Sequence, residues 1–357
     1  MNILHQNEDD GVVDDEIKVS IGCLGSVGGK PRYEINVDAI INFNSKFREK
    51  DLCTGWTYSL GSGCHFNCKF CYVWSIVRQH TAVKMLLAEL EKKNLKFEDV
   101  CVVRHAPLEK MRQQLLRRRS PDIHTPGVVF TSPLVDCAAT KDFALQTAAA
   151  DRIILELTSK DVRHLSKGAS YCTIIDAIPE RFHDRLIFGY SLGTIEGELA
   201  SAIEGRTASP SRRLAELNAL QDRGLRTYGM VCPVMPRADL KDYAKRVIHA
   251  HRVEHLEHIW VEPINVRGES MTNTRDALTV AGFNDLAARV EAVSANKDDW
   301  EEYARELFHA FAAVIPPEKY RFLQYATRAT LPWWTAQRAR GAVILGTGAE
   351  TLSPFRS

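Results

Sequence analysis

An alternation of short β-branched runs with helical stretches constrains the fold of this chain most strongly. The sequence predicts strands at 55–60, 127–132, 152–158, 185–192, 226–234 and 258–264, with helices in the connections. Strands separated by helices pair in parallel through right-handed crossovers. We therefore expect an α/β fold, a partial (β/α)6 barrel, with a doubly wound open sheet as the structural alternative.

The flanks of this repeat have a different character. Residues 1–50 are polar, with six acidic residues and no Lys or Arg in the first 16, and are expected to form a partly disordered N-terminal extension. Residues 51–270 are expected to hold the barrel. Beyond them, 271–357 has helical periodicity and is expected to form a helical C-terminal region. Within the barrel, Ser209, Pro210 and Gly224 predict the start and end of one helix.

Composition excludes several classes of protein. The net charge is +1, so no overall field draws the chain to nucleic acid or to a membrane. No apolar run approaches the roughly 20 residues that span a bilayer, and the acidic start is unlike a signal peptide. We therefore expect a cytoplasmic protein without a membrane partner. Nine cysteines in such a chain indicate reduced thiols and a metal or redox site.

One stretch, "GSGCHFNCKFCYVW" at 61–74, concentrates this chemistry. Cys64, Cys68 and Cys71 lie within eight residues, directly after the first expected strand. Structural zinc takes four ligands, usually as two spaced pairs, and no second pair accompanies this loop. A [4Fe-4S] cluster normally takes four thiolates, so three thiolates leave one iron open to an outside ligand. S-adenosylmethionine can fill that position through its amino and carboxylate groups. Zinc in a non-catalytic binding module remains the alternative of another class.

The CxxxCxxC loop after the first strand of a (βα) barrel resembles the radical S-adenosylmethionine (radical SAM) superfamily. "GCHFNCKFCY", "VVFTSPLVD", "LELTSKD", "GYSLGT" and the segment 202–236 are similar to the spore photoproduct lyase-like or "DNA repair photolyase" branch, over roughly 55–265. The resemblance implies a [4Fe-4S] cluster that reductively cleaves S-adenosylmethionine to a 5′-deoxyadenosyl radical. That radical abstracts a hydrogen atom from the substrate, in lyase or oxidoreductase-type chemistry, and the electron comes from a donor such as flavodoxin or ferredoxin.

The same resemblance suggests a role for individual residues. Phe70, the aromatic before the third cysteine, is expected near the adenine, and Tyr72 near the radical. Lys160 and Ser191 match positions that hold the methionine carboxylate or amino group, and Ser132 and Asp136 are expected to take the ammonium group. Without the resemblance, Lys160 and Ser191 are ordinary strand-end residues facing solvent.

Other positions leave two interpretations open. In spore photoproduct lyase a cysteine hydrogen donor ends the second strand, where this chain has Pro133. Cys137, four residues later, is the candidate donor, with a packed and inert thiol as the alternative. Glu204 and Arg213 are expected to form a structural ion pair or to belong to the site. Glu262 and Asn265 end the sixth strand and are candidate substrate contacts.

The substrate is the least determined part of the prediction. The segments 102–120 and 318–340 carry six and five Lys/Arg, and the second interleaves them with aromatics. Such patches suit nucleic acid, so a nucleobase or nucleic acid is one candidate substrate. A solvated helix face and a packed C-terminal helix are the alternative interpretations of these segments. A peptide or a small metabolite is the alternative substrate.

Overall fold

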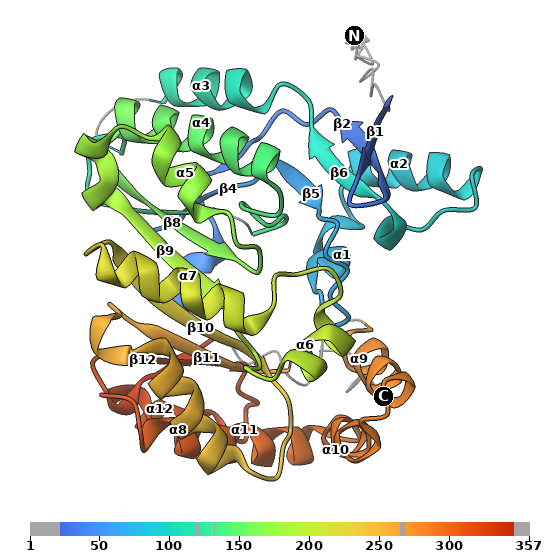
Figure 1. The fold of residues 1–357 in the computed structure, drawn as a ribbon, viewed down its shortest axis with the longest axis vertical. Helices are drawn as coiled ribbons and strands as arrows, with labels where there is room; N and C mark the ends of the chain where they lie inside the picture. Colours follow the sequence, from blue (N-terminus) through green and yellow to red (C-terminus); the bar gives the residue numbers. More distant parts are fainter. Residues whose placement is uncertain (1–21, 119–121, 132, 265–268, 346–357) are drawn as a thin grey trace, which may run out of the picture.

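The computed structural model describes residues 22–118, 122–131, 133–264 and 269–345. Its main element is a nine-stranded sheet in the order β13-β12-β11-β10-β9-β8-β7-β4-β3 (Figure 1). From β4 to β13 all neighbours are parallel, and only β3 is antiparallel to its neighbour β4. The expected parallel α/β sheet is therefore confirmed. The order has two ends, so hydrogen bonding among the described strands does not close it into a ring.

The bounds of the strands in this sheet are β3 (Ile41–Asn42), β4 (Trp56–Tyr58), β7 (Gly127–Thr131), β8 (Lys160–Ser166), β9 (Leu186–Ser191), β10 (Arg226–Val234), β11 (Ile259–Pro263), β12 (Tyr320–Gln324) and β13 (Ala342–Ile344). The α-helices are α1 (Val73–Val77), α2 (Thr81–Glu91), α3 (Pro107–Leu116), α4 (Lys141–Leu157), α5 (Tyr171–Ala177), α6 (Gly197–Glu204), α7 (Pro210–Asp222), α8 (Leu240–His251), α9 (Ser270–Val280), α10 (Asn284–Ser294), α11 (Lys297–Ala312) and α12 (Leu331–Ala336). None of these helices combines the length and the apolar character that crossing a membrane requires.

Helices cover the outer face of the main sheet. Alternate strand residues such as Val162, Phe188 and Val261 pack there against α4, α5, α7, α8 and α11 in the largest hydrophobic core. The expected signals of α7 are present. The Ser209 side chain accepts a hydrogen bond from the backbone N–H of Arg212, Pro210 occupies the first turn, and Gly224 has the positive φ (71°) that favours glycine.

The inner face of the sheet is filled by the segment that precedes β4. Leu52 and Cys53 share a core with Phe130, Tyr228 and Trp260. Arg163, on the inner face of β8, donates to the backbone carbonyls of Asp51 (3.0 Å) and Leu52 (3.1 Å). Residues 46–53, including the 3-10 helix η1 (Lys46–Lys50), therefore belong to the main unit. The expectation that the chain up to residue 50 is only an extension is wrong for this segment.

A second, smaller sheet stands beside the first, with α2 packed against it (Figure 1). Its order is β1-β2-β6-β5, with β1 (Gly22–Val27), β2 (Lys30–Ile35), β5 (Gly61–Gly63) and β6 (Cys101–Arg104). The strand expected at 55–60 is present as β4, which pairs with β7 in the main sheet, whereas the next strand, β5, pairs with β6 in the second sheet. Residues 22–35 are structured. The rest of the N-terminal part expected to be disordered, residues 1–21, lies outside the described residues.

Two expectations about elements fail. Residues 152–158 are not a strand, because α4 continues to Leu157 and the true third strand is β8. The run "RIILEL" is buried in a long helix, and a short buried apolar run has the same appearance in a helix and in a strand. The C-terminal region holds α9, α10 and α11 as expected. However, β12 and β13 extend the main sheet, so this region is not purely helical.

Candidate functional site

The cysteine loop leaves β5 at Cys64 and enters α1 after Tyr72. Its backbone is fixed by the end of α6, because Lys69 N–H donates to Ile203 O (2.9 Å) and Arg206 N–H donates to Phe66 O (2.9 Å). Gly205 lies between these contacts with φ of 66°, and a Cβ there would be 2.3 Å from Phe66 O. Only glycine allows this close approach, so α6 and the cysteine loop are built to fit one another.

The three thiols of the loop do not converge on a single point. No three His, Cys, Asp or Glu side chains in the described part of the chain lie close enough together to hold one metal ion. A [4Fe-4S] cluster binds each thiolate to a different iron, so its ligands need not converge, whereas the ligands of one zinc ion must. The arrangement therefore does not favour the zinc alternative.

Desolvation governs the pKa of the Cys64 and Cys68 thiols, each of which is partly buried. It raises the pKa of Cys64 to about 12, and the nearby charges of Cys71 and Asp136 act in the same direction. The Cys68 thiol, 3.4 Å from Glu204 O, also has a raised pKa because of burial, against which the positive charge of Lys167 acts. A coordinating thiol is deprotonated by the metal, so this loop suits a metal centre better than a free nucleophile.

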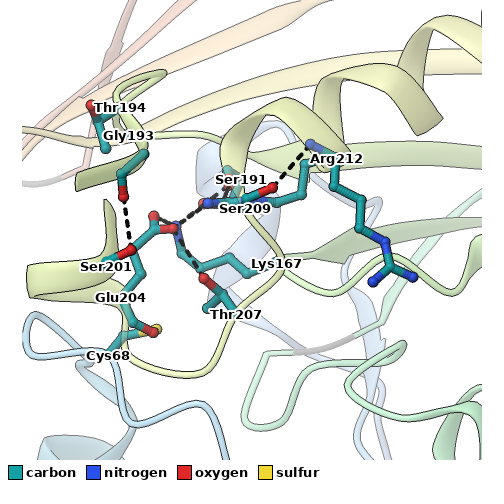
Figure 2. Close-up of polar contacts among 12 residues, drawn as sticks. Cys68, Lys167, Ser191, Gly193, Thr194, Ser201, Glu204, Thr207, Ser209 and Arg212 are labelled. Carbon is teal, nitrogen blue, oxygen red and sulfur yellow. Dashed lines mark hydrogen bonds and ion pairs between the residues drawn. The ribbon is translucent and has the colours of Figure 1, made fainter. Parts of the chain in front are cut away.

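Lys167, which follows β8 directly, is the central cation of the site. Its Nζ lies 2.6 Å from Glu204 Oε1 and 5.0 Å from the centre of the Phe70 ring. It also faces the backbone carbonyls of Ser191 (3.5 Å) and Cys232 (3.4 Å). Figure 2 shows Lys167 and Glu204 pointing toward one another, with Ser191 beside them and Cys68 near Glu204. The ammonium is thus held where β8, β9 and β10 end, against the aromatic of the cysteine loop.

Glu204 joins this cation to a second one. Its Oε2 pairs with Arg213, which is fully buried and also donates to Ser191 O. Burial favours the neutral form of Glu204, but the charges of Lys167 and Arg213 outweigh it and lower the pKa of the carboxyl below its usual value. The expected Glu204–Arg213 pair exists, and through Lys167 it reaches into the site.

Asp136 lies within the same group of side chains, but both of its oxygens are occupied. Oδ1 accepts from Ser166 Oγ (2.7 Å) and Ala138 N–H (2.9 Å), and Oδ2 accepts from Lys167 N–H (2.7 Å). Burial nevertheless raises the pKa of this carboxyl. These hydrogen bonds show that Asp136 positions the turn that carries Lys167. Asp136 has this structural role in addition to any contact with a ligand. Ser132, the expected partner of Asp136, lies outside the described residues.

The expectation for Lys160 is wrong. Lys160 begins β8 instead of ending a strand, and its side chain is 4% exposed. Its Nζ donates to Thr125 O (2.6 Å) and lies 4.8 Å from the ring of Trp56, which belongs to the outer-face core. It therefore lies at the amino ends of the strands, on the outer face, whereas the cysteine loop and Lys167 lie at their carboxyl ends. A Ser-Lys pair occurs twice in the sequence, as Ser159-Lys160 and Ser166-Lys167. Because the third strand was expected at 152–158, the prediction took the first pair, whereas the second lies at the carboxyl end of β8.

A second polar group lies on the inner face, where β10 and β11 end. The Cys232 thiol donates to Glu262 Oε2 (3.1 Å), and Lys50 Nζ pairs with Glu262 Oε1 (3.2 Å). The charges of Lys50, Glu262 and Cys232 all act on the Tyr72 hydroxyl, whose pKa is raised mainly by burial. Glu262 thus lies within electrostatic reach of Tyr72, and its role as a substrate contact stays a prediction. Sequence reasoning missed Lys50 and Cys232, which the fold brings to Glu262 from distant parts of the chain, and Asn265 lies outside the described residues.

The remaining predicted residues separate into two environments. Phe70 and Tyr72 border the site, and the Tyr72 hydroxyl donates to Pro133 O (3.0 Å). Ser191 also lies there, with Oγ donating to Cys232 O (2.9 Å). Cys137, in contrast, is 3% exposed within the outer-face core, and its thiol donates to Leu165 O (3.6 Å). This position supports the packed, inert interpretation of Cys137.

The two basic segments give no support to a nucleic-acid surface at the site. The first contains β6 and α3, and Arg118 stacks 4.2 Å from the ring of Phe43 while pairing with Asp122. In the second, Tyr320, Phe322 and Trp334 are fully buried in the core. The packed interpretation thus holds for these three aromatics, so they are not available for base stacking.

Comparisons with known proteins give distant relatives. No model of a known protein family matches the chain. The chain is 24% identical over 238 residues to the uncharacterized protein ORF301 of Acidianus two-tailed virus, covering 62% of this chain and 71% of the viral protein. That relative has no described activity to carry over.

Among solved structures, the chain is similar to spore photoproduct lyase. It matches a mutant of that lyase, and the lyase complexed with dinucleoside spore photoproduct, each with a TM-score of 0.46 and 14% identity. Another mutant, with bound AdoMet and dinucleoside spore photoproduct, matches with a TM-score of 0.44. These matches cover 63% of this chain, which spans 61% of the length of the lyase chains. At this distance, however, the activity has to be argued from the residues of this chain.

Proposed function

We propose that this chain is a radical SAM enzyme whose cluster loop is Cys64, Cys68 and Cys71. The observation that carries the proposal is the pairing of a three-cysteine loop with a cation, Lys167, held 5.0 Å from the loop aromatic Phe70. Three thiolates leave one iron of a [4Fe-4S] cluster open, and a partly buried ammonium is an apt partner for the carboxylate of a ligand bound there. When bound, the cluster and S-adenosylmethionine supply a carbon-centred radical that abstracts hydrogen.

The residues of the chain fit this pair of cofactors in several ways. Cys64 and Cys68 are partly buried and Cys71 is exposed, and backbone N–H groups of Phe66 and Asp136 point at Cys64. In this proposal Lys167 and Ser191 hold the methionine part of the ligand, with Asp136 fixing the turn of Lys167 and contributing to the ammonium site. Phe70 borders the adenine. Lys167 thus takes the role expected for Lys160.

We propose Tyr72 and Glu262 as residues of the substrate side. Tyr72 follows the third ligand directly, while Glu262 is oriented by Lys50 and by the Cys232 thiol. A carboxylate held between a cation and a thiol is a fixed acceptor for a substrate N–H or O–H group. Cys137 stays in the proposal only as a variant to test, since its thiol lies in the core.

Anaerobic reconstitution with iron and sulfide tests the proposal. We expect about four irons per chain and release of 5′-deoxyadenosine that depends on a reductant, for which flavodoxin or ferredoxin is the proposed natural source. A protein that instead takes up one zinc ion and leaves S-adenosylmethionine intact would contradict it. In the same assay a C137A variant should release 5′-deoxyadenosine as the parent protein does. A folded C137A protein that releases it but forms no product from a substrate would restore Cys137 as a catalytic candidate, because a hydrogen donor acts after the cofactor is cleaved.

The substrate is proposed only as a class, a nucleobase or nucleic acid, with peptides and small metabolites as the alternatives. Incubation with deuterated candidates, UV-damaged DNA among them, tests this class. Deuterium recovered in 5′-deoxyadenosine identifies the position from which hydrogen is abstracted. Transfer from a peptide or a metabolite but from no nucleic acid would overturn the class while leaving the radical chemistry intact.

A further inference from the structure

The turn of the β1–β2 hairpin lies directly on the cysteine loop. A Cβ on Gly28, whose φ is 56°, would come within 2.7 Å of Cδ2 of His65, the residue after the first cysteine. Arg206, which follows α6 and bonds the loop backbone at Phe66, also donates from its guanidinium to Gly28 O. The hairpin, the loop and the end of α6 are therefore packed together as one unit.

This hairpin carries a buried cation. Lys30, the first residue of β2, is 7% exposed and donates from Nζ to Glu98 O. β2 and β5 flank the same strand, β6, in which Cys101 is opposite Arg32 and Val102 is opposite Gly63. Cys64 follows Gly63 directly. Burial lowers the pKa of the Lys30 ammonium, and the charges of the Cys101 thiolate and, next, of the Cys64 thiolate act against it, so Lys30 and Cys64 lie within electrostatic reach.

The corner of the loop at Cys64 also borders a cavity of about 190 Å³. Ser26 and Val27 of the hairpin line one part of it, and Thr140 and Phe143 near the start of α4 line another. The hairpin thus covers one side of the cavity that this thiol borders. A charge buried under such cover interacts strongly with its neighbours, because little water screens it.

We infer that the β1–β2 hairpin is an electrostatic cap of the cluster loop, in which Lys30, assisted by Arg206, raises the reduction potential of the cluster. The inference rests on the proposed function. Reduction adds one negative charge to a centre that already carries three thiolates. A buried cation beside Cys64 stabilises that extra charge, and charge near a cluster is one of the factors that set its potential. In this inference Lys30 acts on the cluster through its charge and does not contact the substrate.

The test compares two buried lysines in the full chain. K30M removes the ammonium near Cys64, while K160M removes an equally buried ammonium at the opposite ends of the strands. Both proteins are reconstituted, their iron content is measured, and the midpoint potential is determined by redox titration with paramagnetic resonance of the reduced cluster. We expect a more negative potential for K30M and an unchanged potential for K160M. K30R, which keeps the charge, should return the potential toward that of the parent protein.

A second variant guards against a K30M protein that fails to assemble. R206Q alters an exposed side chain and should shift the potential in the same direction by a smaller amount. Variants that hold four irons and show the parental potential would overturn the inference, as would an equal shift in K160M. If the parent protein itself binds no cluster, the proposed function fails. This outcome differs from a bound cluster whose potential does not depend on Lys30, which would overturn only the present inference.

Discussion

The ammonium of Lys167 lies 2.6 Å from the carboxylate of Glu204, a contact between two residues that the sequence separates by a strand and a helix. Glu204 is buried, and its ionised form is maintained by Lys167 and Arg213 together, which lower the pKa of its carboxyl. The pair fixes a positive charge at the carboxyl ends of the strands, beside Phe70 and within the reach of a ligand on the cysteine loop.

Replacing Lys167 should weaken the binding of S-adenosylmethionine. A hydrogen bond to a charged partner contributes about 1.5–3 kcal/mol, so K167M should lose at least about tenfold in affinity. Equilibrium dialysis with the reconstituted protein measures this. K160M is the matched control, because it removes a lysine from the amino end of the same strand, and it should bind as the parent does. Equal losses in both variants would contradict the reassignment from Lys160 to Lys167.

Removing Arg213 should destabilise the fold. R213A leaves Glu204 buried with one cation instead of two, and breaking a buried ion pair from one side costs about 3–5 kcal/mol. Urea denaturation of R213A and of R212A tests this, because the neighbouring Arg212 is exposed and its loss should stay within about 0.5 kcal/mol. Similar urea midpoints for R213A and R212A would show that the buried Glu204–Arg213 pair does not stabilise the fold.

Removing a cluster ligand should abolish the iron centre without unfolding the chain. C68A should lose the bound iron, its visible absorbance and the release of 5′-deoxyadenosine after reconstitution. C172A, which alters an exposed cysteine on α5, should retain all three. Iron analysis and thermal unfolding are measured together. A C68A protein that still cleaves S-adenosylmethionine would show that the ligands are assigned wrongly.

His251 should make the fold sensitive to mild acid. Burial lowers the pKa of this ring to about 4, although its bond to Val247 O (2.7 Å) acts in the other direction. The folded chain thus binds fewer protons than the unfolded chain between the ordinary pKa of 6.5 and about 4. The free energy of unfolding should therefore fall as the pH is lowered through that window, by up to about 3 kcal/mol.

The test of His251 compares how steeply the free energy of unfolding depends on pH, because a substitution in the core also changes stability at every pH. H251Q should be less stable than the parent at neutral pH and should show a flatter dependence between pH 6.5 and 4. H249Q, which alters an exposed histidine two residues earlier in the same helix, should keep the parental slope. Urea denaturation across this range measures both. A parental slope in H251Q would assign the acid sensitivity to other groups.

The elements that local patterns predict best are those whose signals are self-contained. Helix α7 was predicted with its cap and its stop because Ser209, Pro210 and Gly224 act within a few residues of where they stand. The apolar run at 153–155 carries no such signal, because burial in a helix and burial in a strand select the same side chains. That single ambiguity displaced the third strand and led to Lys160 instead of Lys167.

What the sequence by itself determined is the three-cysteine loop, since three thiols at that spacing are a local property of the chain, together with the parallel α/β sheet. What only the tertiary structure decided is which distant groups surround that loop. Lys50, Lys167, Glu204 and Cys232 come from four separate segments, and Lys30 reaches the loop through a second sheet. The physical reason is that charge and burial act through space. A lysine at the carboxyl end of a strand lies in the site, and a lysine at the amino end lies at the opposite edge of the sheet. Which end it occupies depends on how the strands pair across the whole sheet.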